Sequence, residues 1–263
     1  NYECFTYKIY TMKRLEGEVA IIAGGSGDMG SSVSKLFLQE GANVVVGDIR
    51  PPKTKSSSKF ISEELDCTQK DSWDQVVSKT IELFGKVTIL VNCFGANFRE
   101  SFKDQGLSNW STIININLTS VFIGIKAVML PMQKAKKGSI INIGSLATLR
   151  GSANSPAYQA SKTGLIGLTK SSALSLADKK IRCNLLCPGH VDTSFIRKNN
   201  PHSPNDWSTS IDNPENYKSR LEKIPAGRFI TPEDIAKVSL FLASEESSMI
   251  TGAIIPVDGG TSL

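Results

Sequence analysis

Short runs of apolar residues alternate along this chain with longer stretches in which apolar residues recur every three or four positions. The short runs are rich in β-branched residues and are bounded by Gly, Asp or Pro, which is typical of buried strands. They predict strands over Val19–Ala23, Asn43–Gly47, Thr88–Asn92, Ser139–Ile143, Ile181–Leu186 and Ala253–Val257. The longer stretches predict helices over Ser31–Glu40, Ser72–Phe84, Trp110–Gln133, Pro156–Ala177 and Pro232–Ala243.

Strands that alternate with helices of this length predict βαβ units and a parallel sheet. We therefore expect an α/β fold, a single Rossmann-type domain over residues 13–263 with a doubly wound parallel sheet and helices on both faces. Residues 1–12 are expected to form a disordered or extension segment. Residues 192–229 lack a regular pattern and are rich in Asn, Pro and Ser. Because long loops in compact domains usually serve a function, we expect this segment to be a lid over the substrate.

Composition and charge favour a soluble cytoplasmic protein. Hydrophobic residues make up 40% of the 263, charged residues 21%, and the net charge is +5. No basic face interleaved with aromatic residues indicates a nucleic-acid partner, and polar residues interrupt the uncharged residues 105–125 too often for a membrane span. No secretory segment is recognisable in residues 1–18. The cysteines show neither pairing nor zinc-site spacing, so no disulfide and no metal site are expected; they are Cys4, Cys67, Cys93, Cys183 and Cys187.

A glycine-rich segment follows the first predicted strand. Gly25, Gly27 and Gly30 satisfy the pattern G-x-G-x-x-G between a strand and a helix, and backbone N–H groups at the start of a helix bind pyrophosphate well. Asp48 ends the second strand, where a carboxylate can accept hydrogen bonds from the adenosine ribose and repel a 2′-phosphate. The segment therefore predicts a dinucleotide site, and Asp48 favours NAD over NADP.

Tyr158 and Lys162 are four residues apart in a predicted helix, so the phenol and the ammonium share one face. A nearby cation favours the phenolate, and we expect it to lower the tyrosine pKa toward a working range for acid–base chemistry. Ser145 follows the strand that ends at Ile143, at the edge where ligands of open α/β sheets bind. A hydroxyl in this place can hydrogen-bond a substrate oxygen.

Lys13 to Gly260 resembles the short-chain dehydrogenase/reductase family. Seven separated features stand in the family's order. They are Ala23–Gly30 for the loop T-G-x-x-x-G-x-G, Asp66 for the adenine-contacting Asp, Asn92–Gly95 for N-N-A-G, Asn117 for the tetrad asparagine, Ser145 with Tyr158 and Lys162, Pro188-Gly189 with Thr193, and the ending Val257–Gly260.

The resemblance implies a role for each tetrad residue. Tyr158 would be the general acid/base, Lys162 would lower its pKa and bind the nicotinamide ribose, Ser145 would polarise the carbonyl, and Asn117 would hold a water in a proton relay. Hydride would pass to or from the nicotinamide. The implied cofactor contacts are Gly24, Ser26, Asp28, Met29, Gly30, Asp48, Asp66, Cys67, Asn92, Gly95, Tyr158, Lys162, Pro188, Gly189, Val191 and Thr193.

The chain departs from the family pattern at three places. Ala23 replaces the loop threonine, Cys93-Phe94 replaces Asn-Ala, and Asp28 stands at a glycine position. At about 4 Å and an effective dielectric constant of 20, a carboxylate and a phosphate repel by about 4 kcal/mol. We expect Gly27 to shift the turn by one residue, so that the Asp28 carboxylate points outward or caps the following helix.

The leading hypothesis is an NAD-dependent oxidoreductase that interconverts a secondary alcohol and a ketone. A second hypothesis keeps this chemistry but uses NADP, with Lys53 and Lys55 reaching the 2′-phosphate. A third is a non-catalytic nucleotide-binding or regulatory protein in which Asp28 has impaired cofactor binding.

Aromatic and apolar residues suggest a partly apolar small-molecule substrate. The candidate neighbours of this substrate are Phe94, Phe98, Leu146, Tyr158, His190, Phe195 and Trp207. The resemblance further implies a homo-dimer or homo-tetramer built from the helices over Trp110–Gln133 and Pro156–Ala177.

Overall fold

The computed structural model describes residues 13–52 and 56–263. The expected extension over residues 1–12, Cys4, Lys53 and Lys55 lie outside these residues. The strands are β1 Val19–Ala23, β2 Asn43–Asp48, β3 Phe60–Glu64, β4 Ile89–Asn92, β5 Gly138–Ile143, β6 Ile181–Pro188 and β7 Ile254–Val257. The main helices are α1 Asp28–Gln39, α2 Lys70–Phe84, α3 Leu107–Ile114, α4 Ser120–Ala135, α5 Pro156–Leu176, α6 Ser194–Arg197, α7 Pro214–Leu221 and α8 Pro232–Ala243.

The strands form one parallel sheet in the order β3-β2-β1-β4-β5-β6-β7. The strand order changes direction between β1 and β4, so the carboxyl ends of these strands open a crevice in which ligands of doubly wound folds bind. The predicted α/β fold with a Rossmann-type sheet is confirmed.

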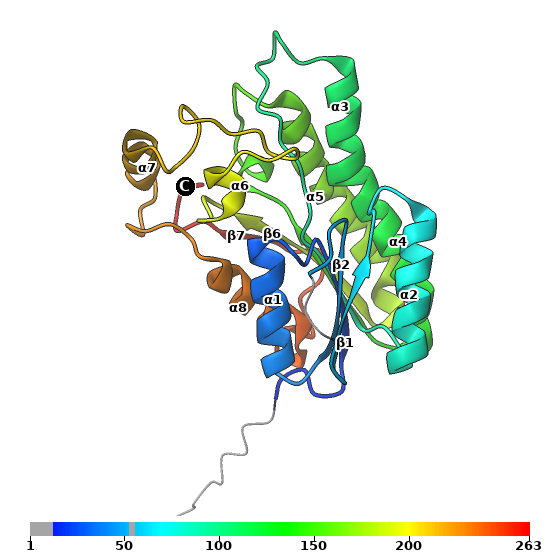
Figure 1. Ribbon diagram of the computed structural model, residues 1–263. Coiled ribbons are helices and arrows are strands. Elements are labelled where there is room, and N and C mark those ends of the chain that lie inside the picture. Colours follow the sequence, from blue (N-terminus) through cyan, green and yellow to red (C-terminus); the bar gives the residue numbers. More distant parts are fainter. Residues whose placement is uncertain (1–12, 53–55) are drawn as a thin grey trace, which may run out of the picture.

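Helices cover both faces of the sheet (Figure 1). α1 and α8 pack together on one face, where Val33, Phe37 and Leu240 meet the strands in one buried cluster. α2, α4 and α5 cover the other face through a second cluster that contains Trp73, Val128 and Leu165. The central strands β1, β4 and β5 are buried on both faces, and this explains why their sequences are mostly apolar and do not alternate with polar residues.

Two elements differ from the sequence prediction. The edge strand β3 is missing from the prediction because Ser62, Glu63 and Glu64 give it a polar sequence and only one side of it packs on β2. α1 begins at Asp28, three residues before the predicted start, because Gly27 is extended and the residue after it is already helical. The glycine loop therefore ends at Gly27, and Asp28 and Gly30 belong to the first turn of α1.

The helix predicted over Trp110–Gln133 is a longer helical run with an irregular turn inside it. α3 leads into a π-helical turn over Asn115–Thr119, and α4 continues from it. By length and composition alone this run, Leu107–Ala135, could cross a membrane. Val121, Ile125, Val128 and Met132 on one side of it belong to the core under the sheet.

The segment without a predicted pattern, residues 192–229, contains the short helices α6 and α7. Figure 1 shows both in the upper part of the molecule, at the end where α1 begins. The segment is tied to the sheet by the Ile230 amide, which donates to the carbonyl of His190, and by the Asp192 amide, which donates back to Ile230.

Candidate active site

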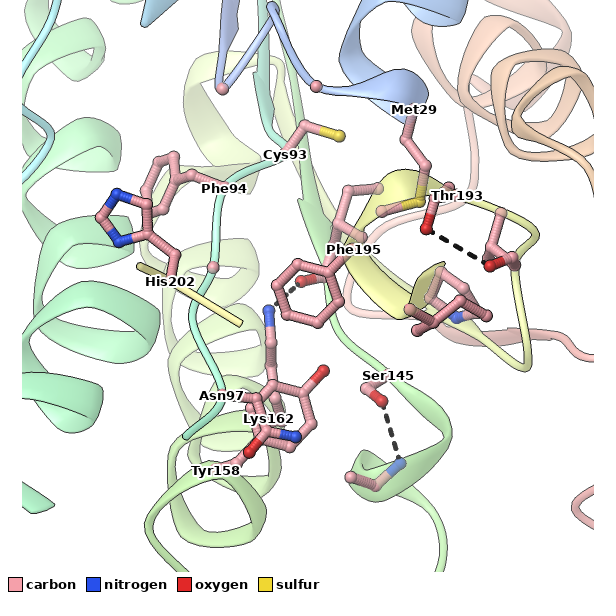
Figure 2. Close-up of a pocket in the computed structure, with 18 of the residues that line it drawn as sticks. Met29, Cys93, Phe94, Asn97, Ser145, Tyr158, Lys162, Thr193, Phe195 and His202 are labelled. Carbon is pink, nitrogen blue, oxygen red and sulfur yellow. Dashed lines mark hydrogen bonds between the residues drawn. The ribbon is translucent and has the colours of Figure 1, made fainter. Parts of the chain in front are cut away.

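A cavity of about 1350 Å³ opens at the carboxyl ends of the strands. It runs from the glycine loop and the end of β2, past the start of α5, to the underside of residues 192–223. The sequence-predicted residues Ser145, Tyr158 and Lys162 lie on its wall, and so do all the predicted cofactor contacts except Asn92. Figure 2 shows Ser145, Tyr158 and Lys162 together, with Met29 and Thr193 toward the cofactor loop. The fold thus gathers residues that are far apart in the sequence.

Three glycines shape the loop between β1 and α1, and they are not the three that the simple pattern selects. Gly24 is left-handed (φ +77°), and a Cβ there would lie 2.8 Å from the amide nitrogen of Phe94. A Cβ at Gly30 would lie 2.4 Å from the carbonyl oxygen of Gly24, and one at Gly25 would lie 2.7 Å from the Val46 side chain. Gly27 has room for a Cβ. Close backbone approach therefore requires glycine at 24, 25 and 30.

Asp28 is the first residue of α1 and is exposed. Its carboxylate accepts a hydrogen bond of 2.6 Å from the amide of Ser194, the first residue of α6. The carboxylate therefore points toward the 192–229 segment and caps no residue of its own helix, where a negative charge in the first turn nevertheless suits the helix dipole. The exposed carboxylate thus does not cap its own helix, which was one of the two expected alternatives, and it makes a contact that joins the cofactor loop to the predicted lid.

The structure fits a dinucleotide at this loop. α1 has twelve residues, and no side chain among the described residues caps its first turn. Its first N–H groups are thus available to an anion such as a pyrophosphate. Asp48 is held in place by accepting hydrogen bonds from the amides of Ser26 (3.0 Å) and Arg50 (3.1 Å). Asp66 lies farther along the same wall and accepts from the amide and hydroxyl of Thr68.

Lys162 is buried, with 4% of its surface exposed, and its ammonium donates to the carbonyl oxygen of Ile143 at 2.8 Å. Burial lowers its pKa from 10.5 to about 8. A Cβ on Gly95 would lie 3.4 Å from this ammonium, so the β4 loop passes close to the lysine. The lysine is therefore fixed between the end of β5 and the β4 loop.

Tyr158 stands one turn before Lys162 on α5, and the ammonium lies 5.9 Å from the centre of its ring. Burial raises the pKa of Tyr158, while the Ser145 hydroxyl and the Arg99 guanidinium act in the opposite direction. The expected lowering of this pKa by Lys162 is not found, because desolvation outweighs the charges nearby. In this state the phenol is neutral, which suits a proton donor.

Ser145 caps a short 3₁₀ turn over Leu146–Thr148, and its Oγ accepts from the amide of Ala147 at 3.2 Å. Accepting this bond leaves its O–H free to donate to another group. The turn holds Ser145 on the cavity wall beside Tyr158.

Two of the predicted site residues lie behind the cavity wall. The Asn117 side chain, presented by the π-helical turn, binds the backbone of Ala96 in both directions (2.8 and 2.9 Å) and the Ser161 hydroxyl (3.1 Å). Asn92 donates to Asn142 across the sheet at 2.9 Å. Both side chains position the walls of the site, and the water relay through Asn117 stays a prediction.

The substrate end of the cavity differs from the sequence expectation. Phe94, Leu146, His190 and Phe195 line it. Phe98 instead packs against Ala96, Ile113 and Ala157, and Trp207 is 65% exposed and outside the cavity. Basic residues that the sequence reasoning did not single out take part in the wall, and they are Arg50, Arg99, Arg150, Lys198, Arg220 and Lys223. Nothing in their sequence context distinguishes them from surface cations.

Comparisons with known proteins agree with this geometry. Residues 24–262 match the family model described as enoyl-(acyl carrier protein) reductase. The chain is 36% identical over 256 residues to a 3-oxoacyl-[acyl-carrier-protein] reductase of Thermotoga maritima, covering 94% of this chain and 98% of that protein. It is 38% identical over 253 residues to a 3-alpha-(or 20-beta)-hydroxysteroid dehydrogenase of Mycobacterium bovis, covering 94% and 90%. The ligand-free aldohexose dehydrogenase of Thermoplasma acidophilum superposes with a TM-score of 0.86 at 29% identity, covering 95% and 96%.

Proposed function

The chain belongs to the short-chain dehydrogenase/reductase family of oxidoreductases, which act on CH–OH and C=O groups, and from this premise we propose that it interconverts a secondary alcohol and a ketone with NAD(H). The observation that carries the proposal is the grouping of Ser145, Tyr158 and Lys162 on the wall of a cavity that also holds the glycine loop and Asp48. A bound nicotinamide supplies or accepts the hydride.

The protein's own groups handle the proton and the developing charge. In ketone reduction the Tyr158 phenol gives its proton to the carbonyl oxygen, and Ser145 donates a second hydrogen bond to the same oxygen. In alcohol oxidation Tyr158 takes the proton back. The raised pKa of Tyr158 favours the donor role near neutral pH, and the positive charge of Arg99 acts in favour of the phenolate that forms.

Asp48 supports NAD as the cofactor. Its carboxylate is oriented by the Ser26 and Arg50 amides on the cavity wall, and at this place it can bind ribose hydroxyls and repel a 2′-phosphate. One observation favours the NADP alternative, because the Arg50 side chain lines the same end of the cavity. In this alternative Arg50 would bind the 2′-phosphate of NADP, the role that the sequence analysis gives to Lys53 and Lys55.

The test is to measure binding and turnover with both cofactors. NADH and NADPH are titrated by their fluorescence, and kcat/KM is compared over a panel of ketones and secondary alcohols. We expect turnover with kcat/KM higher for NAD(H) than for NADP(H). A preference for NADP(H) would overturn the cofactor assignment, and tight binding without turnover of any compound would support the non-catalytic alternative.

We further propose a homo-oligomer that buries the outer faces of α4 and α5. Phe122 and Leu130 on α4 are 50% and 60% exposed, and Leu174 on α5 is 83% exposed. Apolar side chains of this size on neighbouring helices are suited to a second copy of the chain. Light scattering after size exclusion tests this, since Leu130→Asp should lower the mass and Leu263→Asp at the exposed carboxyl end should not.

A further inference from the structure

The cavity carries opposite charges at its two ends. The carboxylates on its wall, Asp28, Asp48 and Asp66, all belong to the glycine loop and the neighbouring strand ends. Beyond Tyr158 the wall contains cations from the β4 loop and from α6 to α7 and no carboxylate within the described residues; they are Arg99, Lys198, Arg220 and Lys223. The substrate end is therefore positively charged.

Arg99 is held by several contacts although it has no acidic partner among the residues that the structure describes. Its backbone is left-handed (φ +56°), a conformation that costs a non-glycine residue about 1 kcal/mol. Its guanidinium donates to the carbonyl oxygens of Pro204 (2.7 Å) and Phe195 (3.3 Å) and lies 5.7 Å from the centre of the Phe195 ring. These contacts satisfy donors and fix direction, but they leave the positive charge uncompensated.

Arg220 faces the same cavity from α7. Like Arg99 it is half-buried, and it donates to the carbonyl oxygen of Thr209 at 2.7 Å. Among the described residues no ion pair includes either arginine. Nearby carboxylates have other partners, since Asp192 and Asp212 bind Arg197 and Glu100 binds Asn109.

The cations at this end repel one another. Burial and then Arg220 lower the pKa of Arg99. Burial, Arg220 and Lys223 lower the pKa of His190 to about 4. A region that combines partial burial with several like charges is stabilised when an anion enters it.

We propose that the substrate carries an oxyanion, a carboxylate or a phosphate, that Arg99 and Arg220 bind while Tyr158 faces the reacting carbonyl. Planar guanidinium groups suit such an oxyanion because each can donate two parallel hydrogen bonds to it. Lys198 and Lys223, which are exposed and line the same cavity, attract the anion from solution. The proposal rests on the proposed ketone–alcohol chemistry for its turnover measurement alone.

The first experiment compares oxo acids with their methyl esters as matched substrates. We expect kcat/KM for an acid to exceed that for its ester at least tenfold. Arg220→Gln should lower kcat/KM for the acid by 10–100-fold and leave the ester within about threefold. Arg99→Gln should also lower kcat/KM for the acid more than tenfold beyond any loss for the ester, because the Arg99 charge acts on Tyr158 with either substrate. Arg228→Gln is the control, because Arg228 is paired with Asp234 outside the cavity. This substitution should leave kcat/KM unchanged for the acid and for the ester. Esters that react as well as acids would overturn a carboxylate as the oxyanion while leaving the proposed function intact, and the phosphate arm of the second experiment then decides the proposal.

The second experiment needs no turnover. Thermal unfolding with saturating NADH is followed against inorganic phosphate or acetate at constant ionic strength. We expect a saturable rise in Tm with one of the two, which identifies the kind of oxyanion, and the rise should be lost in Arg99→Gln and Arg220→Gln but kept in Arg228→Gln. NADH fluorescence shows that each variant is folded. A response to neither ion, or one that both variants retain, would overturn the proposal even if no reaction is found.

Discussion

The two halves of the cavity are built differently. The cofactor half consists of strand ends and a helix start, which place Asp48 and Gly30, and of the tight turn at Gly24 that joins β1 to α1. The substrate half consists of the left-handed turn at Arg99 and the irregular segment around α6 and α7. Within the described residues the carboxylates of the wall all lie in the cofactor half, whereas the substrate half carries arginines and lysines without a carboxylate. At the edge of a regular sheet the site residues keep a fixed spacing that can be recognised in the sequence. In an irregular segment only tertiary contacts decide which charged residues come together.

Tyr158 stands where the two halves meet, and its removal gives the largest expected effect. Tyr158→Phe deletes the proton donor but keeps the ring, so kcat should fall by about 10²–10⁴-fold. The Kd of NADH should stay within about twofold, because the cofactor half is untouched. Steady-state kinetics and NADH fluorescence measure the two quantities. Tyr217→Phe on α7, where Tyr217 stacks on Phe229, should retain activity; full activity in Tyr158→Phe would contradict the catalytic assignment.

Lys162, buried at the same junction, links stability to pH. Its pKa is 10.5 in the unfolded chain and about 8 in the folded protein, so between these values the unfolded chain binds more protons and the free energy of unfolding rises with pH. Below pH 8 the full cost of burying the ammonium, about 3 kcal/mol, is present. Lys162→Met has no ammonium to bury. Compared with the wild type, it should therefore be about 3 kcal/mol more stable at pH 7, and this advantage should be gone at pH 10.5.

Urea unfolding at a series of pH values measures this difference. Lys170→Met, which removes an exposed lysine from the same helix, is the control and should track the wild type. A stability difference for Lys162→Met that does not change with pH would show that the ammonium is not desolvated.

How much could be read from the sequence differs between the halves. The sheet, most helices and the cofactor wall follow from apolar periodicity and motif spacing, because buried parallel strands and close glycine contacts constrain residue type. Asn92 carries a family motif but faces Asn142 in the core, and no pattern states which way a side chain points. Arg99 and Arg220 are 121 positions apart and share a cavity only through the folding of the 192–229 segment. Such charges look like solvated surface residues until the fold is known.

A substitution of Asp48 tests whether the carboxylates of the cofactor half set the preference for NAD over NADP. Asp48→Asn keeps the shape but removes the charge that would face a 2′-phosphate. For a half-buried carboxylate this repulsion is worth about 2 kcal/mol, so the ratio of kcat/KM for NAD to that for NADP should fall about thirtyfold. Glu64→Gln removes a carboxylate from the neighbouring strand end that does not line the cavity, and should leave the ratio unchanged. An unaltered ratio in Asp48→Asn would place cofactor choice elsewhere, with Arg50 the first candidate.

Asp28 joins the two halves, and its effect should be the smallest. Because the carboxylate is exposed and turned to the Ser194 amide, its repulsion of a pyrophosphate is reduced to about 1 kcal/mol. Asp28→Asn keeps an oxygen that can accept from Ser194 while removing the charge, so the Kd of NADH should fall about fivefold. Asp28→Gly also removes the contact to the 192–229 segment, and a higher KM for the ketone in this variant alone would separate the contact from the charge. If Asp28→Asn bound NADH no more tightly than the wild type, the loop would already keep this charge clear of the cofactor.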